Sequence, residues 1–282
     1  MPCLSKSRIA LNRIVCPRLS LEEFFGLCAS LGLGSAELRN DLPGGKIIDD
    51  CSPDEARGLA DRYGIELLTV NALQQFNLGP LLKEKMAALQ LLVELAGEIN
   101  CRAVVLCPNN DARDNRDPGQ MYADTVAALE AFGPLLEAGG TAGYVEPLGF
   151  SQSSLASLLT AQRAISESGF SCYRMVFDTF HHFLGPDTRE SLERGLDVRL
   201  IGIVHASGTA IDLPAADYQD GHRGLVFADD RLKSKEQIEY LLDRGYEGTV
   251  AFEPFAARVQ ALPLSELTAE LERSIACLTG GS

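Results

Sequence analysis

The sequence lacks the patterns that mark several common classes of protein. No apolar run is long enough for a secretion signal or a membrane span, so we expect a cytoplasmic protein with no membrane partner. No two cysteines are spaced as CxxC, which leaves a structural zinc site unsupported. The eight cysteines are scattered, and we expect reduced thiols.

Positive charge is also scarce. The chain has 25 lysines and arginines against 39 acidic residues, a formal net charge of −14. Such an acidic surface repels phosphate backbones, so we expect no nucleic acid partner. The same acidity favours a cation at any cluster of carboxylates.

Short apolar runs recur along the 282 residues, and 46% of all residues are hydrophobic. Each run is followed by a longer stretch with helical periodicity, and runs that are apolar throughout are typical of parallel strands covered on both faces. The first turn reads RIVCPRLS and lacks GxGxxG, which argues against a dinucleotide-binding sheet. We therefore predict an α/β fold, a (β/α)₈ TIM barrel in a single domain over residues 1–282. The expected strands are 8–12, 35–39, 66–71, 103–107, 143–147, 175–179, 200–206 and 249–254.

The expected helices alternate with these strands. Serine caps followed by acidic residues predict helices that begin after Ser20 and Ser52. Apolar residues recur at helical spacing in the later stretches, of which the one after the sixth strand is the shortest. These stretches are 82–96, 122–138, 154–168, 189–195, 234–244 and 265–278.

Polar side chains end the last four apolar runs at equivalent positions. The active sites of such barrels lie at the carboxyl ends of the strands, so these side chains should converge. Three carboxylates crowded together would raise one another's pKa unless a cation compensated them. Oxygen ligands with one imidazole suit one divalent metal ion, which would be Mn²⁺, Mg²⁺, Co²⁺ or Zn²⁺. The predicted metal ligands are Glu146, Asp178, His205 and Glu253.

Further polar residues could bind a substrate. His181 follows Asp178 by three residues and could reach the same pocket from the start of the sixth loop, or be a packed loop histidine. Glu37 and Asn71, at the ends of the second and third strands, would form part of a polar rim for a polyhydroxylated ligand, or be ordinary loop residues. Arg223 lies in the long stretch 207–230 and could bind a substrate oxygen, or belong to a solvated turn.

Several motifs together resemble the xylose isomerase-like barrel superfamily, and within it most closely the inosose (2-keto-myo-inositol) isomerases of inositol catabolism. The resemblance spans essentially the whole chain. This sequence differs from the relatives at 225–230 (LVFADD), where they carry a glycine-rich stretch. The motifs are AELRND at 36–41, the Glu146 strand, VFDTFHHF at 176–183, IVHASG at 203–208, DGHR at 220–223 and FEPF at 252–255.

The resemblance implies a function for these residues. Glu146, Asp178, His205 and Glu253 take the metal-ligand positions, and Glu146 and Glu253 also form the acid/base pair. His181 and Arg223 take positions that contact the substrate. The expected enzyme is an isomerase of a small polyol or sugar that moves a proton through a cis-enediolate. A homodimer or homotetramer is expected by analogy.

Four other functions remain open from the sequence. The same ligands would serve a ketose 3-epimerase or a 3-dehydroshikimate dehydratase. A nuclease like endonuclease IV needs many histidines for its metal cluster, and this chain has four. A non-catalytic sugar-binding barrel would be expected to have lost at least one metal ligand.

Overall fold

Eight parallel strands form a closed barrel in the computed structural model, which describes residues 3–280. Each strand pairs with its neighbours in the sequence, and β1 pairs with β8 to close the sheet. This confirms the predicted α/β class and the (β/α)₈ TIM barrel. The strands are β1 (Ile9–Asn12), β2 (Ser35–Arg39), β3 (Glu66–Leu73), β4 (Ala103–Leu106), β5 (Ala142–Val145), β6 (Tyr173–Asp178), β7 (Ile201–Ala206) and β8 (Thr249–Phe252).

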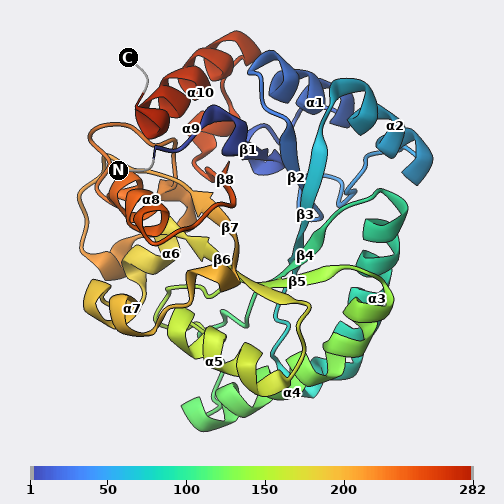
Figure 1. Cartoon of the computed structure of the whole chain (residues 1–282), viewed down its shortest axis with the longest axis vertical. Helices are drawn as coiled ribbons and strands as arrows, with labels where there is room; N and C mark the ends of the chain where they lie inside the picture. Colours follow the sequence, from blue (N-terminus) through green and yellow to red (C-terminus); the bar gives the residue numbers. More distant parts are fainter. Residues whose placement is uncertain (1–2, 281–282) are drawn as a thin grey trace.

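Helices surround the strands on the outside of the barrel (Figure 1). The first two begin where the sequence predicts, because Ser20 and Ser52 each form a capping box with the glutamate three residues later. The helices are α1 (Leu21–Ser30), α2 (Pro53–Tyr63), α3 (Leu82–Glu98), α4 (Pro118–Ala138), α5 (Leu158–Ser168), α6 (Thr179–Leu184), α7 (Arg189–Gly195), α8 (Ser234–Asp243), α9 (Ala257–Gln260) and α10 (Leu264–Thr279). The short helices α6 and α9 lie outside the predicted set.

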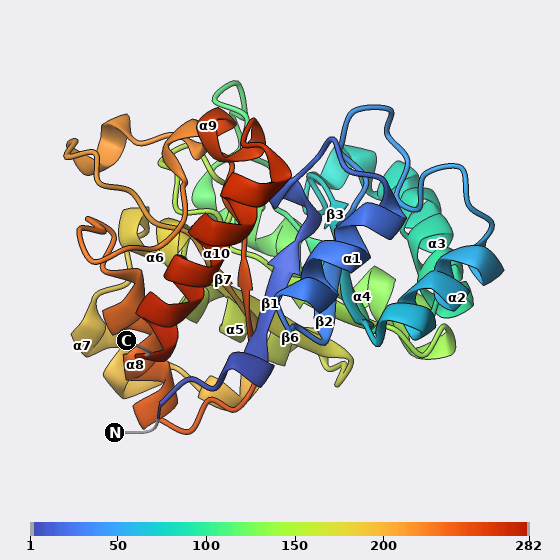
Figure 2. The same cartoon turned by 90° about the horizontal axis from the view of Figure 1, so that it is seen from above.

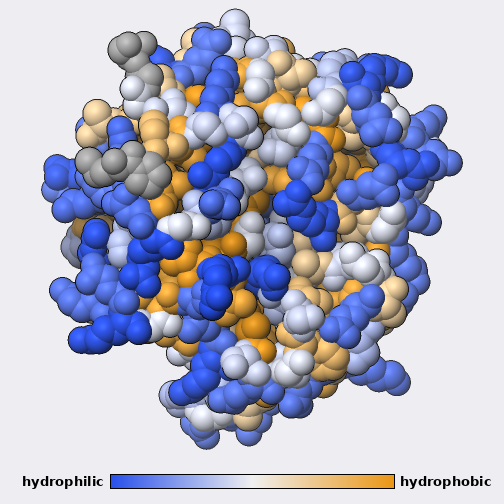
Figure 3. Space-filling model, viewed as in Figure 1, coloured by the Kyte–Doolittle hydropathy of each residue, from blue (hydrophilic) through white to orange (hydrophobic). Residues whose placement is uncertain are grey.

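The core has two large parts and a small third cluster of Phe180, Tyr218 and Leu232. Inside the barrel, small and branched side chains such as Ala103, Val176 and Ile203 pack together with Tyr144. A larger cluster fills the space between strands and helices and includes Phe24 and Phe132, both fully buried. Hydrophilic side chains cover much of the outer surface on the face shown in Figure 3. Within residues 3–280, no helix combines the length and apolarity needed to cross a bilayer.

A long segment follows β7 at the carboxyl end of the barrel. It contains the short 3₁₀ helices η5 (Ala215–Asp217) and η6 (Asp220–His222). Its two ends are joined by an antiparallel bridge between Gly208 and Gly224. A Cβ on Gly208 would lie 2.9 Å from the carbonyl oxygen of Leu225, so glycine allows this close approach. The long seventh loop is therefore fixed at its base.

Candidate metal centre

The four predicted ligands converge on one point inside the barrel mouth. Glu146 directly follows β5, Asp178 ends β6, His205 lies in β7 and Glu253 directly follows β8. Each is at most 4% exposed. One ligand atom from each residue lies within 4.8 Å of the others. Neighbouring parallel strands present these side chains at the same depth, as the strand-end pattern predicts.

His205 turns one ring nitrogen toward the three other candidate ligands and the other toward the carboxylate of Glu37. Its Nδ1 lies 2.9 Å from Glu146 Oε1, 3.2 Å from Glu253 Oε2 and 3.9 Å from Asp178 Oδ2. Its Nε2 lies 3.1 Å from Glu37 Oε1. A histidine that ligates a metal typically donates its other N–H to a carboxylate, which fixes the ring. This geometry makes Nδ1 the candidate ligand atom.

Asp178 is oriented by the start of α6. Its Oδ1 accepts hydrogen bonds from the backbone N–H groups of Phe180, at 2.7 Å, and His181, at 3.0 Å. The residue is therefore an N-cap as well as a candidate ligand. Its other oxygen, Oδ2, is left to face the centre.

The charges of the buried centre do not balance. Four carboxyl groups belong to it, those of Glu37, Glu146, Asp178 and Glu253, against the two guanidinium groups of Arg39 and Arg223. Four minus two leaves two negative charges when His205 is neutral, the state in which it would ligate a metal, and without an ion a proton on His205 offsets one of them. Buried charges without partners are strongly unfavourable, and one divalent ion would cancel this excess. Three carboxylate oxygens and an imidazole nitrogen are also a suitable donor set. The residues present therefore fit a divalent metal ion.

The pKa values of these groups reflect their crowding. Burial raises the pKa of Asp178 to about 7, although Arg223 opposes this shift. Burial opposes ionisation of His205 as well, but the charges of Glu253, Glu37 and Glu146 raise its pKa well above the usual value. Burial would also raise the pKa of Glu253, yet His205 and Arg223 hold it well below the usual range. Glu253 is therefore ionised at neutral pH.

The sequence matches the description "Xylose isomerase-like TIM barrel" over residues 25–279. The chain belongs to this family. A crystal structure of a xylose isomerase domain-containing protein from Salmonella typhimurium LT2 is 34% identical, with a TM-score of 0.92 and 99% of both chains covered. This similarity extends the family assignment to nearly the whole chain.

Two more distant structures share the fold. The IolI protein with a bound zinc atom is 20% identical, with a TM-score of 0.86, 97% of this chain and 98% of that chain being covered. D-psicose 3-epimerase from Clostridium cellulolyticum H10, solved with D-tagatose, is 16% identical, with a TM-score of 0.71 and 96% and 99% coverage. No curated protein matches the sequence of this chain.

His181 lies beside the centre of this family member, on α6 rather than in a loop. The sequence placed it at the start of a loop, but the Asp178 cap begins a short helix there. Its ring is buried edge-on against Phe150, at 5.2 Å between centroids, and Phe180, at 5.4 Å. Burial, together with the charge of Arg223, lowers the pKa of His181 to about 3, so its imidazole is neutral. His182 packs against Phe177 instead.

Glu37 and Asn71 lie inside the barrel, not at its solvent-exposed rim. Glu37 is fully buried and Asn71 is 1% exposed. Glu37 Oε1 accepts hydrogen bonds from Thr69 Oγ1, at 2.5 Å, and Asn71 Nδ2, at 3.2 Å. Its Oε2 accepts one from Asn12 Nδ2 at 3.3 Å. The substrate-binding role predicted for Glu37 and Asn71 stays a prediction, while their hydrogen bonds support His205.

Two further residues of the centre are Asn12, which the sequence analysis did not single out, and Arg39, which it expected only as part of the polar rim at the end of the second strand. Asn12 donates to both Glu37 and Glu253, each at 3.3 Å. It ends the RIALN run, so the strand-end test applied to β1 would have found it. Arg39 donates from Nη1 to Glu253 Oε1 at 2.6 Å and pairs with Asp41. Only its position in the AELRND motif indicated a role.

Replacing Glu37 by glutamine tests the support of His205. The amide keeps the size of the side chain but removes the charge that holds His205 Nε2, so we expect affinity for Co²⁺ to fall about 10–100-fold. Isothermal titration calorimetry measures this affinity. Glu130→Gln, on the exposed surface of α4, is the matched control and should bind as the wild type does. An unchanged affinity in Glu37→Gln would show that Glu37 does not support the ligand.

Two neighbouring features are separate from this chemistry. Cys107 Sγ donates to Glu146 Oε2 at 3.3 Å. Burial raises the pKa of this thiol well above the usual value, so Cys107 is no nucleophile at neutral pH.

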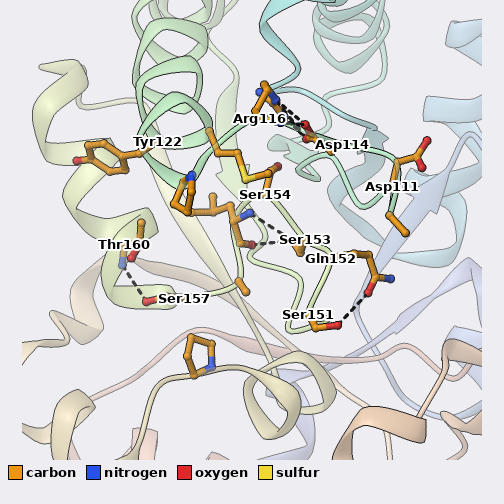
Figure 4. A pocket seen from close by; sticks show the side chains of 16 residues that line it. Asp111, Asp114, Arg116, Tyr122, Ser151, Gln152, Ser153, Ser154, Ser157 and Thr160 are labelled. Carbon is orange, nitrogen blue, oxygen red and sulfur yellow. Dashed lines mark hydrogen bonds and ion pairs between the residues drawn. The ribbon is translucent and has the colours of Figure 1, made fainter.

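A pocket of about 430 Å³ lies between the segments that follow β4 and β5 (Figure 4). Arg116 there is already paired with Asp114 and Asp124. The four candidate ligands do not line this pocket.

Proposed function

We propose that the protein is a metal-dependent isomerase of a small polyol ketone, and specifically an inosose isomerase. The observation that carries this proposal is the convergence of Glu146, Asp178, His205 and Glu253 at a buried centre that has more carboxyl groups than guanidinium groups. The motifs that resemble inosose isomerases support the choice of substrate. The fold shared with the zinc-binding IolI protein supports the choice of metal centre.

The residue types suit proton transfer next to a carbonyl group. When bound, the divalent ion supplies Lewis-acid stabilisation of negative charge on oxygen. Glu146 and Glu253 form the acid/base pair: one removes the proton from the carbon beside the ketone, and a carboxyl group returns a proton to the former ketone carbon. Neutral His181 is suited to exchange a proton between the two substrate oxygens. Burial of all three side chains keeps water away from the transfer.

The charge balance favours an uncharged substrate. With a divalent ion, the buried carboxyl groups and guanidinium groups sum to zero. This sum counts Arg39, which pairs with Glu253 and Asp41, and Arg223, which pairs with Asp178 and Glu253 when no ion is bound. A substrate carboxylate would add a negative charge to a buried centre whose charges already sum to zero, which is costly. The balance therefore supports an inosose over dehydroshikimate.

A ketose 3-epimerase is the second candidate. It starts with the same proton removal beside a ketone and acts on an uncharged substrate. The shared fold with D-psicose 3-epimerase supports this alternative. The epimerase reaction differs from the isomerase reaction only in the carbon to which the proton returns.

A substrate panel tests both functions. The purified protein would be incubated in D₂O with inosose, a ketohexose or dehydroshikimate, each with Mn²⁺, Co²⁺, Mg²⁺ or Zn²⁺, and followed by NMR. We expect deuterium incorporation beside the ketone of inosose, with formation of its isomer. Incorporation into the ketohexose alone would favour the epimerase. Turnover of dehydroshikimate alone, or no exchange in any neutral ketone, would overturn the proposal.

A further inference from the structure

Arg223 contacts the same carboxylate oxygens that face the candidate ligand atom of His205. Its Nη2 donates to Asp178 Oδ2 and, at 2.6 Å, to Glu253 Oε2. These two oxygens lie 3.9 Å and 3.2 Å from His205 Nδ1. The other oxygen of Asp178 is already occupied by two backbone N–H groups. A cation held by these two oxygens and His205 Nδ1 would therefore lie beside the guanidinium group of Arg223.

The surroundings of Arg223 hold its charge close to the centre. The side chain is 2% exposed. Its guanidinium carbon lies 4.7 Å from the ring centroid of Phe255 and 5.2 Å from that of Phe180. Its Nε donates to Ser207 Oγ at 3.3 Å, and its Nη1 pairs with Asp220 at 3.2 Å. Its charge would repel a divalent ion at the centre.

Arg223 is also the last residue of the segment 209–223, which we call the β7 loop. The loop lies between Gly208 and Gly224, whose N–H groups and carbonyl oxygens bond reciprocally at 2.9 Å and 2.7 Å. Figure 2 shows this orange segment projecting beyond the neighbouring helices. Away from its base, Tyr218 packs against Phe180 and Phe183. The ion pairs of Arg223 therefore connect the loop directly to Asp178 and Glu253.

The burial of the centre requires some part of the mouth to move. The four candidate ligands and Arg223 are each at most 4% exposed, so a polyol cannot contact them in this arrangement. The β7 loop contacts the ligands through the ion pairs of Arg223, while its base is held by backbone bonds between Gly208 and Gly224 and from Ala256 N–H to the Arg223 carbonyl oxygen at 2.7 Å. Weakening those pairs would free the loop to open while the strands and their ligands stay in place.

We propose that Arg223 competes with the divalent ion for Asp178 Oδ2 and Glu253 Oε2, so that ion binding loosens the β7 loop. The inference rests on the metal centre of the proposed function and adds a positioning role for Arg223. Arg223 lowers the affinity of the centre for metal and couples metal loading to opening of the mouth.

Calorimetric titration with Co²⁺ tests the competition. Arg223→Gln removes the charge, and we expect it to bind Co²⁺ at least about tenfold more tightly than the wild type, because a repulsive charge within a few ångströms is lost. Arg223→Lys keeps the charge and should stay closer to the wild type. Arg199→Gln is the matched control, because Arg199 is exposed and pairs with Asp197, outside both the centre and the β7 loop. Equal or weaker binding by Arg223→Gln would overturn the competition.

Hydrogen exchange of the wild-type protein tests the coupling without any substitution. We expect saturating Co²⁺ to increase amide exchange in residues 209–223 and to leave the outer helices unchanged. Slower or unchanged exchange in the loop would overturn the coupling. If the wild type binds no Co²⁺, Mn²⁺ or Zn²⁺, the proposed function fails. If it binds metal and Arg223→Gln binds no more tightly, only the inference about Arg223 fails.

Discussion

Replacing Glu253 by glutamine is expected to lower the isomerisation rate about 10²–10⁴-fold while the barrel stays folded. The carboxylate of Glu253 is held ionised by His205 and Arg223 and is a candidate proton acceptor. Glutamine has the same size and keeps an oxygen for Arg39 or Arg223, but its amide cannot accept the proton. Glu146→Gln should behave similarly, because the two glutamates form the proposed acid/base pair.

The measurement separates chemistry from folding. Steady-state kcat on inosose reports the chemical step, and circular dichroism with a thermal melt reports the fold. Glu236→Gln, exposed on α8, is the control and should retain the wild-type rate. A near wild-type kcat in either Glu253→Gln or Glu146→Gln would refute the acid/base assignment.

The barrel could be predicted from the sequence because its signals are local. Each strand is a short apolar run. The starts of α1 and α2 are predicted by serine caps, and both serines form capping boxes in the structure. The short helix α6 escaped prediction because its start depends on Asp178, whose side chain was interpreted as a ligand only. One carboxylate performs both tasks, since Oδ1 caps the helix and Oδ2 faces the centre.

The candidate metal centre could be predicted only in part. Glu146, Asp178, His205 and Glu253 each end or nearly end a strand, so strand geometry alone brings them together. The contacts of Arg39 and Arg223 with Glu253 join residues 214 and 30 positions away from it in the chain, and no local pattern encodes them. The placement of Glu37 under His205 depends in the same way on closure of the barrel.

Removal of divalent metal by a chelator is expected to abolish turnover and to lower the melting temperature. The buried centre has two more carboxyl groups than guanidinium groups, and an ion that binds only the folded state offsets this excess. An ion at about 1,000 times its dissociation constant stabilises the fold by about 4 kcal/mol. For a chain of this size the melting temperature should fall by about 5–15 °C.

Differential scanning calorimetry of chelated and metal-loaded protein checks this result, and readdition of Mn²⁺, Co²⁺ or Zn²⁺ should restore both the melting temperature and turnover. The Asp178→Asn variant tests whether the stabilising ion binds at this centre. The substitution weakens one ligand, while the side-chain oxygen of the asparagine can still cap α6. We expect this variant to melt at nearly the same temperature with and without metal. If chelation changes neither melting temperature nor rate in the wild type, the excess negative charge is balanced within the chain and the metal centre is disproved.

If chelation lowers the melting temperature of Asp178→Asn as much as that of the wild type, the stabilising ion binds elsewhere. A centre at Glu146, Asp178, His205 and Glu253 cannot lose a charged ligand without losing affinity for the ion.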